Sequence, residues 1–313
     1  MTSVVVLAGG TGGAKLAHGF QHVVGAGELT VIANVADDLE LFGLHVSPDL
    51  DSVLYTLAGI VGESGWGVRG DTWTALEMLG RLGEPTWFRI GDADLATHVR
   101  RSRLLREGST LTDVSRALAG SLGVTTQVVP ATDDPVRTVV STDAGELDFQ
   151  TYFVARAQRD EVRGVRFAGI EQARPSPAAI AAIAEADLIV IAPSNPIVSV
   201  APILGIRGMR EGVQGAAAAC VAVSPIIGGH ALKGPADRML ASLGHEVSAL
   251  GVARLYAGIV DRFVLDEQDA ELAPAIAALG MAVDVLPTVM STEEDRAELA
   301  RRIISAADAM LGR

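Results

Sequence analysis

Short apolar runs rich in β-branched residues alternate along the chain with longer segments whose apolar positions follow helical spacing. Residues 3–8 form one such run, a glycine-rich segment follows, residues 14–24 have helical spacing, and residues 29–34 form a second apolar run. A strand, a helix and a second strand in this order predict a right-handed parallel crossover. The fold class predicted from this pattern is therefore α/β.

The same alternation continues to the C-terminal end. Further helices are predicted at residues 48–57, 72–82, 95–106, 112–122, 177–186, 235–243, 270–279 and 292–311, the first of them with Ser47 as its cap and Pro48 as its first residue. Further strands are predicted at residues 125–129, 137–141, 146–154, 188–192, 220–223, 262–265 and 282–286. No segment resembles a flexible linker. We expect one domain, residues 1–313, with a Rossmann-like three-layer core, a mostly parallel sheet and a helical insertion at residues 69–122.

The composition narrows the classes of protein and of site. Of the 313 residues 49% are hydrophobic and 20% charged, which is typical of a globular protein with a large core. A single cysteine, Cys220, excludes a disulfide framework and a cysteine zinc site. The six histidines show no metal-ligand spacing, so we expect any metal to be held by oxygen atoms.

The charge and the apolar stretches argue against large anionic partners. The net charge of −13 disfavours nucleic acid and an anionic membrane surface. The uncharged stretches 188–206 and 212–232 are interrupted by prolines and glycines, which favours buried strands and loops over membrane spans. The first residues do not resemble a signal peptide, so we expect a cytoplasmic protein.

The glycine-rich segment, residues 9–13, is the most informative local signal. Glycines before a helix let the backbone approach a phosphate, and the helix N-terminus favours its negative charge. The pattern fails the Walker sequence and, because Lys15 stands where glycine or alanine is required, also the dinucleotide fingerprint. A tight turn without a ligand is the alternative, but we interpret the segment as a phosphate site and disfavour classical NAD binding.

Four aspartates follow the second predicted strand, where open α/β sheets bind ligands: Asp37, Asp38, Asp49 and Asp51. Mg²⁺ prefers one or two carboxylates together with phosphate oxygens and water, so this group predicts a metal site. Asp49 and Asp51 lie in the first turn of a predicted helix, where acids are also common without a ligand. The pattern leaves open which of the four bind the metal.

Two rigid loops follow apolar strands further along the chain. Residues 193–196, of sequence PSNP, and residues 224–229, of sequence SPIIGG, place uncharged polar groups at strand ends, and Lys233 follows the second loop. Each could be a simple turn. Two such loops at one edge of a sheet favour a binding site.

The region between positions 55 and 106 combines aromatic, acidic and basic residues. Arg89 and His98 could line a site, whereas the neighbouring arginines at 100, 101, 103 and 106 are more typical of a solvated face. Tyr55, Trp66, Trp73, Trp87 and Phe88 are expected to pack in a core or a dimer contact, with stacking on a planar ring as the alternative. No motif of a covalent nucleophile is present in the sequence.

Taken together, segments over nearly the whole chain closely resemble the 2-phospho-L-lactate transferase family, whose actinobacterial members are usually described as phosphoenolpyruvate transferases. These segments are LAGGTGGAKL, NVADD, SPDLDSVLYTLAG, GDADLATHVRRSRLLREG, LTDVSRAL, DDPVRT, FQTYFV, APSNPIVSVAPIL, AVSPIIGG and TVMSTEED. The resemblance implies a step in the biosynthesis of the deazaflavin coenzyme F(420). In it a phospho-three-carbon-acid moiety, phosphoenolpyruvate or 2-phospho-L-lactate, moves from its guanosine diphospho-adduct to the ribityl hydroxyl of the deazaflavin Fo, and GMP leaves. Mg²⁺ is the implied cofactor and a homodimer the implied assembly.

The resemblance also assigns residues. It places Asp51 and Arg89 at the Fo side and Asp37 in the metal site, and we expect His98 at the Fo side as well. We expect Asp37 with Asp49 or Asp51 to hold Mg²⁺, and Asp37 and Asp51 to be the catalytic acids. The nucleotide side is expected to comprise two loops and a lysine: Gly10, Thr11, Gly12, Gly13, Lys15, Ser194, Asn195 and Pro196.

Two alternatives stay open at this point. The glycine-segment fold is also similar to a family of bacterial regulators that bind nucleotide sugars without known catalysis. An NAD-dependent oxidoreductase rests on fold analogy alone.

Overall fold

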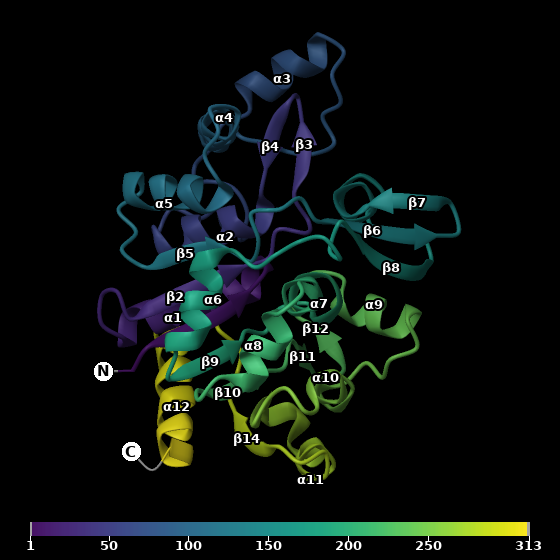
Figure 1. Ribbon diagram of the computed structural model, residues 1–313. Helices are drawn as coiled ribbons and strands as arrows, with labels where there is room; N and C mark the ends of the chain where they lie inside the picture. Colours follow the sequence, from purple (N-terminus) through teal and green to yellow (C-terminus); the bar gives the residue numbers. More distant parts are fainter. Residues whose placement is uncertain (1, 312–313) are drawn as a thin grey trace.

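A central sheet of seven parallel strands organises residues 2–311, the part of the chain that the computed structural model describes (Figure 1). Its strands are β1 (Val4–Ala8), β2 (Leu29–Ala33), β5 (Gln127–Pro130), β9 (Leu188–Ile191), β10 (Ala219–Val223), β13 (Arg262–Asp266) and β14 (Ala282–Leu286). They lie in the order β14-β13-β10-β9-β1-β2-β5. From β1 the chain builds the sheet first toward β5 and later, through β9, toward β14, so the order reverses beside β1.

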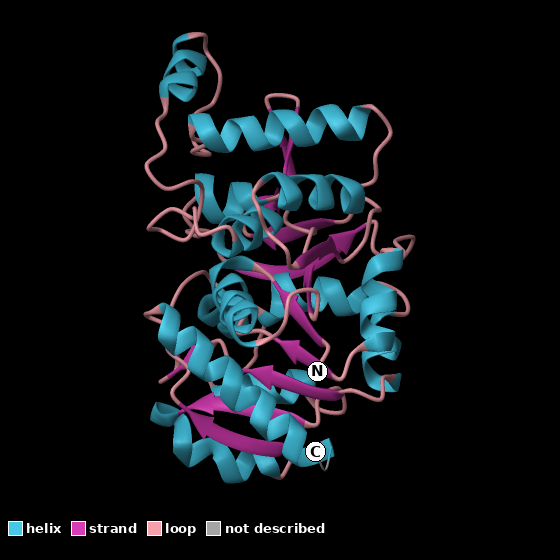
Figure 2. Ribbon diagram, turned by 90° about the vertical axis from the view of Figure 1, so that its left-hand side faces the viewer, coloured by secondary structure: helices cyan, strands magenta, loops and turns pink. Residues whose placement is uncertain are grey.

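Alternate residues of each strand face opposite layers of helices. In β1, Val4, Val6 and Ala8 join one core and Val5 and Leu7 the other, so every side chain of this central strand is buried. The first layer consists of α1 (Gly10–Val23), α2 (Pro48–Leu57), α5 (Leu111–Ser121) and α12 (Glu293–Leu311). The second consists of α6 (Pro177–Glu185), α7 (Ala201–Gly205), α8 (Met209–Gly215), α9 (Ala236–Ser242), α10 (Ala249–Tyr256) and α11 (Ala273–Ala277). Figure 2 shows helices on both sides of the strands, which confirms the predicted three-layer α/β core.

Several smaller elements extend beyond the layers at the end where the strands finish. The hairpin β3 (Leu39–Leu41) and β4 (Leu44–Val46), α3 (Thr74–Arg81) and α4 (Asp92–Arg106) lie together above the sheet in Figure 1. An antiparallel sheet of β6 (Arg137–Thr142), β7 (Gly145–Asp148) and β8 (Val162–Ala168) lies beside them. The short pair β11 (Ile226–Ile227) and β12 (His230–Ala231) follows β10. We propose that residues 69–122 are an insertion within a single domain, because α3 and α4 leave the layered core and α5 returns to it.

Three sequence predictions are corrected by the structure. The first helix begins at Gly10 and not at position 14, because the glycine segment itself forms its first turn. The predicted strand 146–154 ends at Asp148, and the π-helical turn η1 (Thr151–Ala155) follows, with Phe149 and Tyr152 buried in a small third core. The predicted helix 270–279 is split into the 3₁₀ turn η3 (Glu267–Leu272) and α11.

The N-cap residue of α2 is the predicted one, but its side chain does not bond to the helix. Ser47 does occupy the N-cap position, but its side chain makes no capping bond. Its hydroxyl donates instead to Asp38 Oδ2 at 2.5 Å. The hydroxyl therefore helps to position a carboxylate, and the fixed φ of Pro48 starts the helix.

Among the described residues, no helix is both long and apolar enough to cross a membrane, and the stretches 188–206 and 212–232 are divided between strands, turns and short helices.

The contact between α1 and α12 gives a test of the packing. A methyl group added at Gly19 in α1 would lie 2.1 Å from the backbone oxygen of Arg296 in α12, so this helix pair depends on glycine there. We expect Gly19→Ala to lower the free energy of unfolding by about 1–3 kcal/mol. Gly120 in α5 is the matched control, since no atom lies within 4 Å of an added methyl group. Gly120→Ala should be neutral or stabilising by up to about 1 kcal/mol. Equal effects of both variants in urea unfolding would contradict this dependence.

Candidate active site

The candidate site lies where the parallel strands end beside β1. Crevices of this kind form where the strand order of an open α/β sheet reverses. A cavity of about 220 Å³ occupies this place, with walls from the start of α1, the loops after β2, β9 and β10, and the segment before α12. The topology therefore places the predicted glycine segment, the first aspartates and both rigid loops at one cavity.

The glycine segment packs directly against the loop after β9. A Cβ at Gly12 would lie 2.3 Å from the backbone oxygen of Pro193, which only glycine avoids. Ser194 Oγ joins the two segments, since it accepts from the Gly9 N–H at 3.1 Å and donates to the Gly9 oxygen at 2.8 Å. At Gly10, where φ is +62°, no atom lies within 4 Å of an added Cβ, so the backbone faces open space. The segment thus combines a packing role with an exposed helix N-terminus.

Asp37 and Asp49 are buried side by side at this helix end. The amide of Asn34, at the end of β2, donates to Asp49 Oδ2 at 2.9 Å and to Asp37 Oδ2 at 3.3 Å. The N–H of Gly10 donates to Asp49 Oδ1 at 2.8 Å. Asp37 Oδ1 is buried and has no hydrogen-bond partner. Two carboxylates and an unpartnered oxygen form a set of donors that fits a hard divalent cation.

Burial and mutual repulsion both disfavour the charged forms of this pair. Burial, followed by the charge of Asp49, raises the pKa of Asp37 well above its usual range. Burial raises the pKa of Asp49 to about 6, against the opposing hydrogen bonds from Asn34 and Gly10. Without a cation, both carboxyl groups therefore hold their protons to a higher pH than an ordinary aspartate does.

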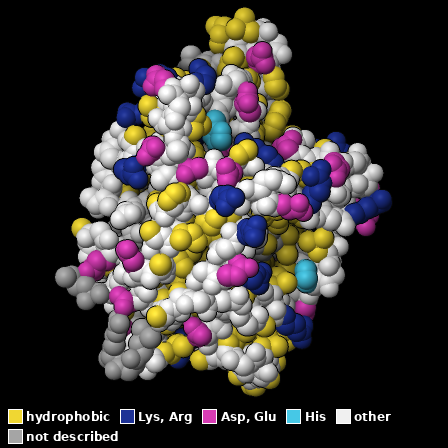
Figure 3. Space-filling model, viewed as in Figure 1, with side chains coloured by type: hydrophobic (Ala, Val, Ile, Leu, Met, Phe, Trp, Pro, Cys, Tyr) yellow, Lys and Arg dark blue, Asp and Glu magenta, His cyan; other side chains and the backbone are white. Residues whose placement is uncertain are grey.

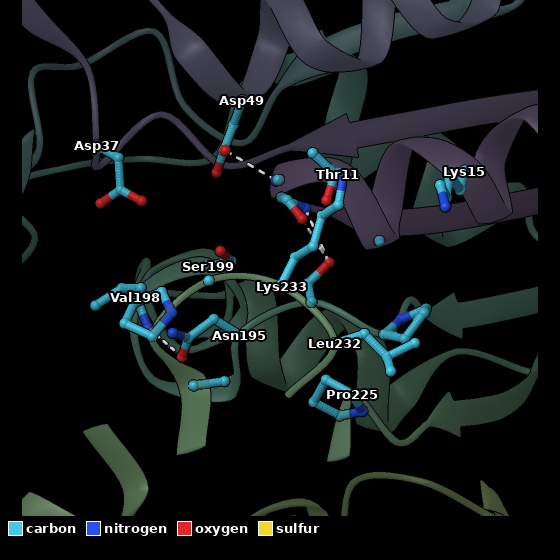
Figure 4. A pocket seen from close by; sticks show the side chains of 18 of the residues that line it. Thr11, Lys15, Asp37, Asp49, Asn195, Val198, Ser199, Pro225, Leu232 and Lys233 are labelled. Atoms are coloured by element: carbon cyan, nitrogen blue, oxygen red, sulfur yellow. Dashed lines mark hydrogen bonds between the residues drawn. The ribbon is translucent and has the colours of Figure 1, made fainter. Parts of the chain in front are cut away.

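Two lysines add positive charge to the same cavity. Lys15 of α1 donates to the backbone oxygen of Met290 at 2.8 Å, and Lys233 donates to the oxygen of Ser64 at 2.9 Å. Burial and the charges of Arg296 and Lys233 lower the pKa of Lys15. Figure 4 shows Asp37 and Asp49 on one side of the cavity and Asn195 and Ser199 on the other, with Lys233 reaching toward Thr11. Among its lining residues are all the predicted nucleotide-side positions except two: Gly13 and Pro196.

A second cavity, of about 310 Å³, adjoins the first. Asp49, Trp66, Phe149 and Phe153 line both cavities. The second cavity is lined in addition by α2, α4 and the segment before α4, including Asp51, Tyr55, Trp87, Phe88, Arg89, Asp94 and His98. The face seen in Figure 3 carries hydrophobic side chains in its middle with Lys and Arg side chains close by.

Aromatic rings form much of the second cavity. Trp87 and Phe88 meet edge to face with ring centroids 5.7 Å apart, and Phe149 and Phe153 stack at 5.5 Å. The Arg89 guanidinium lies 4.5 Å from the centroid of the Trp73 ring. Phe149 and Phe153 belong to one of the segments that carry the family resemblance, but the sequence gives these rings no role, because their spacing equally fits a buried core.

Asp51 lines the second cavity and, unlike Asp37 and Asp49, not the first. Both its oxygens accept hydrogen bonds from Arg101. Asp51, Asp94 and His98 bring three ligand atoms within 4.8 Å of one another, which is compatible with a divalent cation. Arg101 already neutralises Asp51 within this group, and Asp38 is engaged by Ser47 and His45.

A family model described as 2-phospho-L-lactate transferase CofD matches residues 4–300. The chain belongs to this family. A 2-phospho-L-lactate transferase from Methanosarcina mazei is 38% identical, over 97% of this chain and 100% of the relative. Phosphoenolpyruvate transferases from Streptomyces griseus and Kitasatospora aureofaciens are 39% and 40% identical, each over 97% of this chain and 98% of the relative. The family makes the chain a transferase and confirms the resemblance inferred from the sequence.

Solved structures support the fold. A member of the UPF0052 family from Bacillus halodurans superposes with a TM-score of 0.65, covers 96% of this chain and 98% of its own, and is 17% identical. At this identity the likeness concerns the Rossmann-like architecture alone.

The buried carboxylate pair predicts how stability depends on pH and on Mg²⁺. The raised pKa of Asp49 means that the folded state holds its proton more tightly than the unfolded state, so its contribution to stability falls as the pH rises from 3.8 through about 6. In EDTA at about pH 8, Asp49→Asn should therefore raise the melting temperature by a few degrees. Mg²⁺ should stabilise the unmodified protein at this pH and have little effect on the variant.

Asp113→Asn is the control for this experiment, because Asp113 lies on the surface of α5 and pairs with Arg116 there. Its Mg²⁺ response should match that of the unmodified protein. If Mg²⁺ left the melting temperature of the unmodified protein unchanged at every pH, this would contradict a metal site at Asp37 and Asp49.

Proposed function

We propose that this transferase moves a phospho-three-carbon-acid moiety from its guanosine diphospho-adduct to the ribityl hydroxyl of Fo, with release of GMP, in the biosynthesis of coenzyme F(420). The observation that carries the proposal is the pair of adjoining cavities that meet at Asp49. One has the character of a phosphate site and the other that of a site for a planar ring. A transfer between two bound substrates requires such a junction.

The first cavity suits the guanosine diphospho-adduct. The N-terminus of α1 has no side-chain cap and no acid in its first turn. The N–H of Gly10 already donates to Asp49, but the N–H groups that follow it in the first turn are suited to an anion. Lys15 and Lys233 supply positive charge near it. The loops after β9 and β10 add uncharged polar groups, among them Ser194, Asn195 and Ser224, that are suited to ribose and base.

The second cavity suits Fo. A deazaflavin is a flat aromatic system with a polyol chain, and flat rings bind by stacking on aromatic side chains. Trp66, Trp87 and Phe88 provide such surfaces, whereas Asp51, Arg89 and His98 provide polar partners. In the proposed orientation the ribityl end of such a ligand points toward the shared residue Asp49 and the first cavity. This arrangement supports the assignment of Asp51, Arg89 and His98 to the Fo side.

Mg²⁺ fits the Asp37–Asp49 pair, because the oxygen donors, the missing partner of Asp37 Oδ1 and the raised pKa values all call for a cation. Bound there, Mg²⁺ would neutralise charge on the diphosphate. We therefore propose Asp37 and Asp49 as the metal ligands and place Asp51 on the acceptor side.

The reaction depends on the positioning of the two substrates more than on covalent participation of the protein. The acceptor hydroxyl attacks the phosphorus next to the three-carbon acid, the bond from this phosphorus to the bridging oxygen breaks, and GMP leaves with that oxygen. The N-terminus of α1 and the lysines stabilise the negative charge that develops on GMP. The hydroxyl loses its proton to a carboxylate or to water at the junction. Cys220 is buried in β10 and takes no part.

We further propose a cytoplasmic homodimer, as the resemblance implies. The cytoplasm fits the proposed donor, because a guanosine adduct is made where nucleotides are available. Exposed apolar side chains on α3 and at its two ends, Trp73, Met78 and Leu82, support a protein contact in this region. Light scattering of the purified protein tests the dimer directly.

The reaction is tested by a coupled assay. Purified protein, Fo, Mg²⁺ and a guanylyltransferase that makes the adduct of phosphoenolpyruvate or of 2-phospho-L-lactate are combined, and the product is identified by mass spectrometry. We expect a product equal to Fo plus one phospho-acid. Relatives named for either acid are about equally similar to this chain, so the mass of the product decides between them. If Fo bound but neither adduct gave a product, we would infer that the donor carries a different acid.

A metal-site variant tests the mechanism within the same assay. Asp37→Asn removes one proposed ligand and should lower turnover by about 10²-fold or more, the scale seen when a group that stabilises transition-state charge is lost. Asp113→Asn on the surface should leave turnover unchanged. Near-normal turnover of the Asp37 variant would remove this residue from the mechanism. If the protein bound a nucleotide sugar but not Fo, the regulator alternative would replace the transferase.

A further inference from the structure

Arg101 is a large, fully buried side chain behind the lining of the second cavity, with 1% of its surface exposed. It lies on α4, one turn after His98, and reaches across to α2. Its Nη1 donates to Asp51 Oδ2 at 3.1 Å, and its Nη2 donates to Asp51 Oδ1. Nη1 also donates to the backbone oxygen of His45 at 3.4 Å and to His98 Nδ1 at 3.1 Å. The sequence pattern predicts this arginine on a solvated face, so its burial is a correction.

We propose that Arg101 is a positioning residue, which fixes Asp51 as an acceptor for the hydroxyl groups of the ligand in the second cavity. The proposal rests on the proposed function in that the ligand is Fo, whose ribityl chain carries such hydroxyls. Arg101 acts through Asp51, which lines the cavity, whereas Arg101 itself does not line it.

The geometry of the pair supports this role. A carboxylate has about four lone-pair positions, and a forked guanidinium uses one on each oxygen. The remaining positions of Asp51 are available to a ligand, and the forked contact keeps the carboxylate plane from turning. A lysine could neutralise Asp51 but could not hold both oxygens in this way.

The charges around the pair keep Arg101 in place. Burial lowers the pKa of Arg101, but the charges of Asp51 and Asp38 outweigh it and raise the pKa overall. His45 approaches Asp38 at 2.8 Å, and Tyr55 donates to Asp94 at 2.8 Å. The positively charged Arg101 side chain therefore lies in a region that is otherwise rich in carboxylates.

The neighbouring histidine is ordered by the same guanidinium. Because His98 Nδ1 accepts from Arg101, we infer that its proton is on Nε2, which faces Asp94 Oδ1 at 3.3 Å. Arg101 thus sets the orientation of two lining side chains.

A double-mutant cycle separates this role from a purely structural one. The variants are Arg101→Gln, Asp51→Asn and their combination, and the readout is quenching of Fo fluorescence on binding, without turnover. We expect each single substitution to weaken Fo binding about ten- to hundredfold, the scale for a hydrogen bond to a charged group. The double variant should bind Fo no more weakly than Asp51→Asn alone. The affinity for GDP, measured by calorimetry, should be unchanged in all three.

Two further variants distinguish a loss of Fo binding from misfolding. Arg101→Gln leaves Asp51 as a buried charge without its partner, which can destabilise the fold. Arg101→Lys keeps the charge, and we expect it to fold and still to lose Fo affinity. Arg103→Gln is the matched control, because Arg103 lies on the exposed face of α4 and pairs with Glu107; its Fo affinity should not change.

The outcomes distinguish the inference from the function on which it rests. Unchanged Fo affinity in both Arg101 variants would overturn the inference alone. The inference also fails if Arg101→Gln weakens binding equally with and without Asp51, since Arg101 would then act on the fold in general. Failure of the unmodified protein to bind Fo would overturn the proposed function, and the inference with it.

Discussion

Two buried carboxylates at the reversal point of the sheet constrain the whole site. Asp37 and Asp49 come from the loop after β2 and from the first turn of α2, and one amide, that of Asn34, holds them together. Burying two like charges is unfavourable unless a cation or a proton accompanies them. The N-terminus of α1, through the N–H of Gly10, offsets part of this cost. The pair therefore favours the binding of a cation at the point where the two cavities meet.

The division of labour between the two cavities follows from this position. The cavity on the α1 side is lined by the lysines and the polar loops, whereas the cavity on the α4 side is lined by aromatic rings and by Asp51, which pairs with Arg101 behind it. Asp49 lines both. The Asp37–Asp49 pair is therefore suited to a metal and a diphosphate. Asp51, whose charge Arg101 already neutralises, is suited to neutral hydroxyl groups. The sequence leaves open whether Asp51 shares the metal, and we propose a role on the acceptor side for it instead.

Much of the fold could be predicted from the sequence, because buried parallel strands such as β1 and β9 are continuous apolar runs. From the sequence the glycine segment is predicted to precede the helix, because glycine disfavours helices. It forms the first turn of α1 because only glycine can lie so close to Pro193. The hairpin β3–β4 was missed because its strands are three residues long, too short for a periodic signal.

The candidate site was predictable to a similar extent. The aspartates and the loop after β9 were found because they follow strands. Asn34, Arg101 and the rings of Phe149 and Phe153 were not assigned roles, because their function depends on partners distant in the sequence. Arg101 and Asp51 are 50 positions apart, and no local pattern predicts that they meet.

The central claim is that two ligands occupy the adjoining cavities at the same time. Calorimetric titration of Fo into protein that is already saturated with GDP and Mg²⁺ tests it most directly. The claim predicts that Fo still binds, with one Fo per chain and an affinity close to that for the protein without nucleotide. Mutually exclusive binding of Fo and GDP would contradict it.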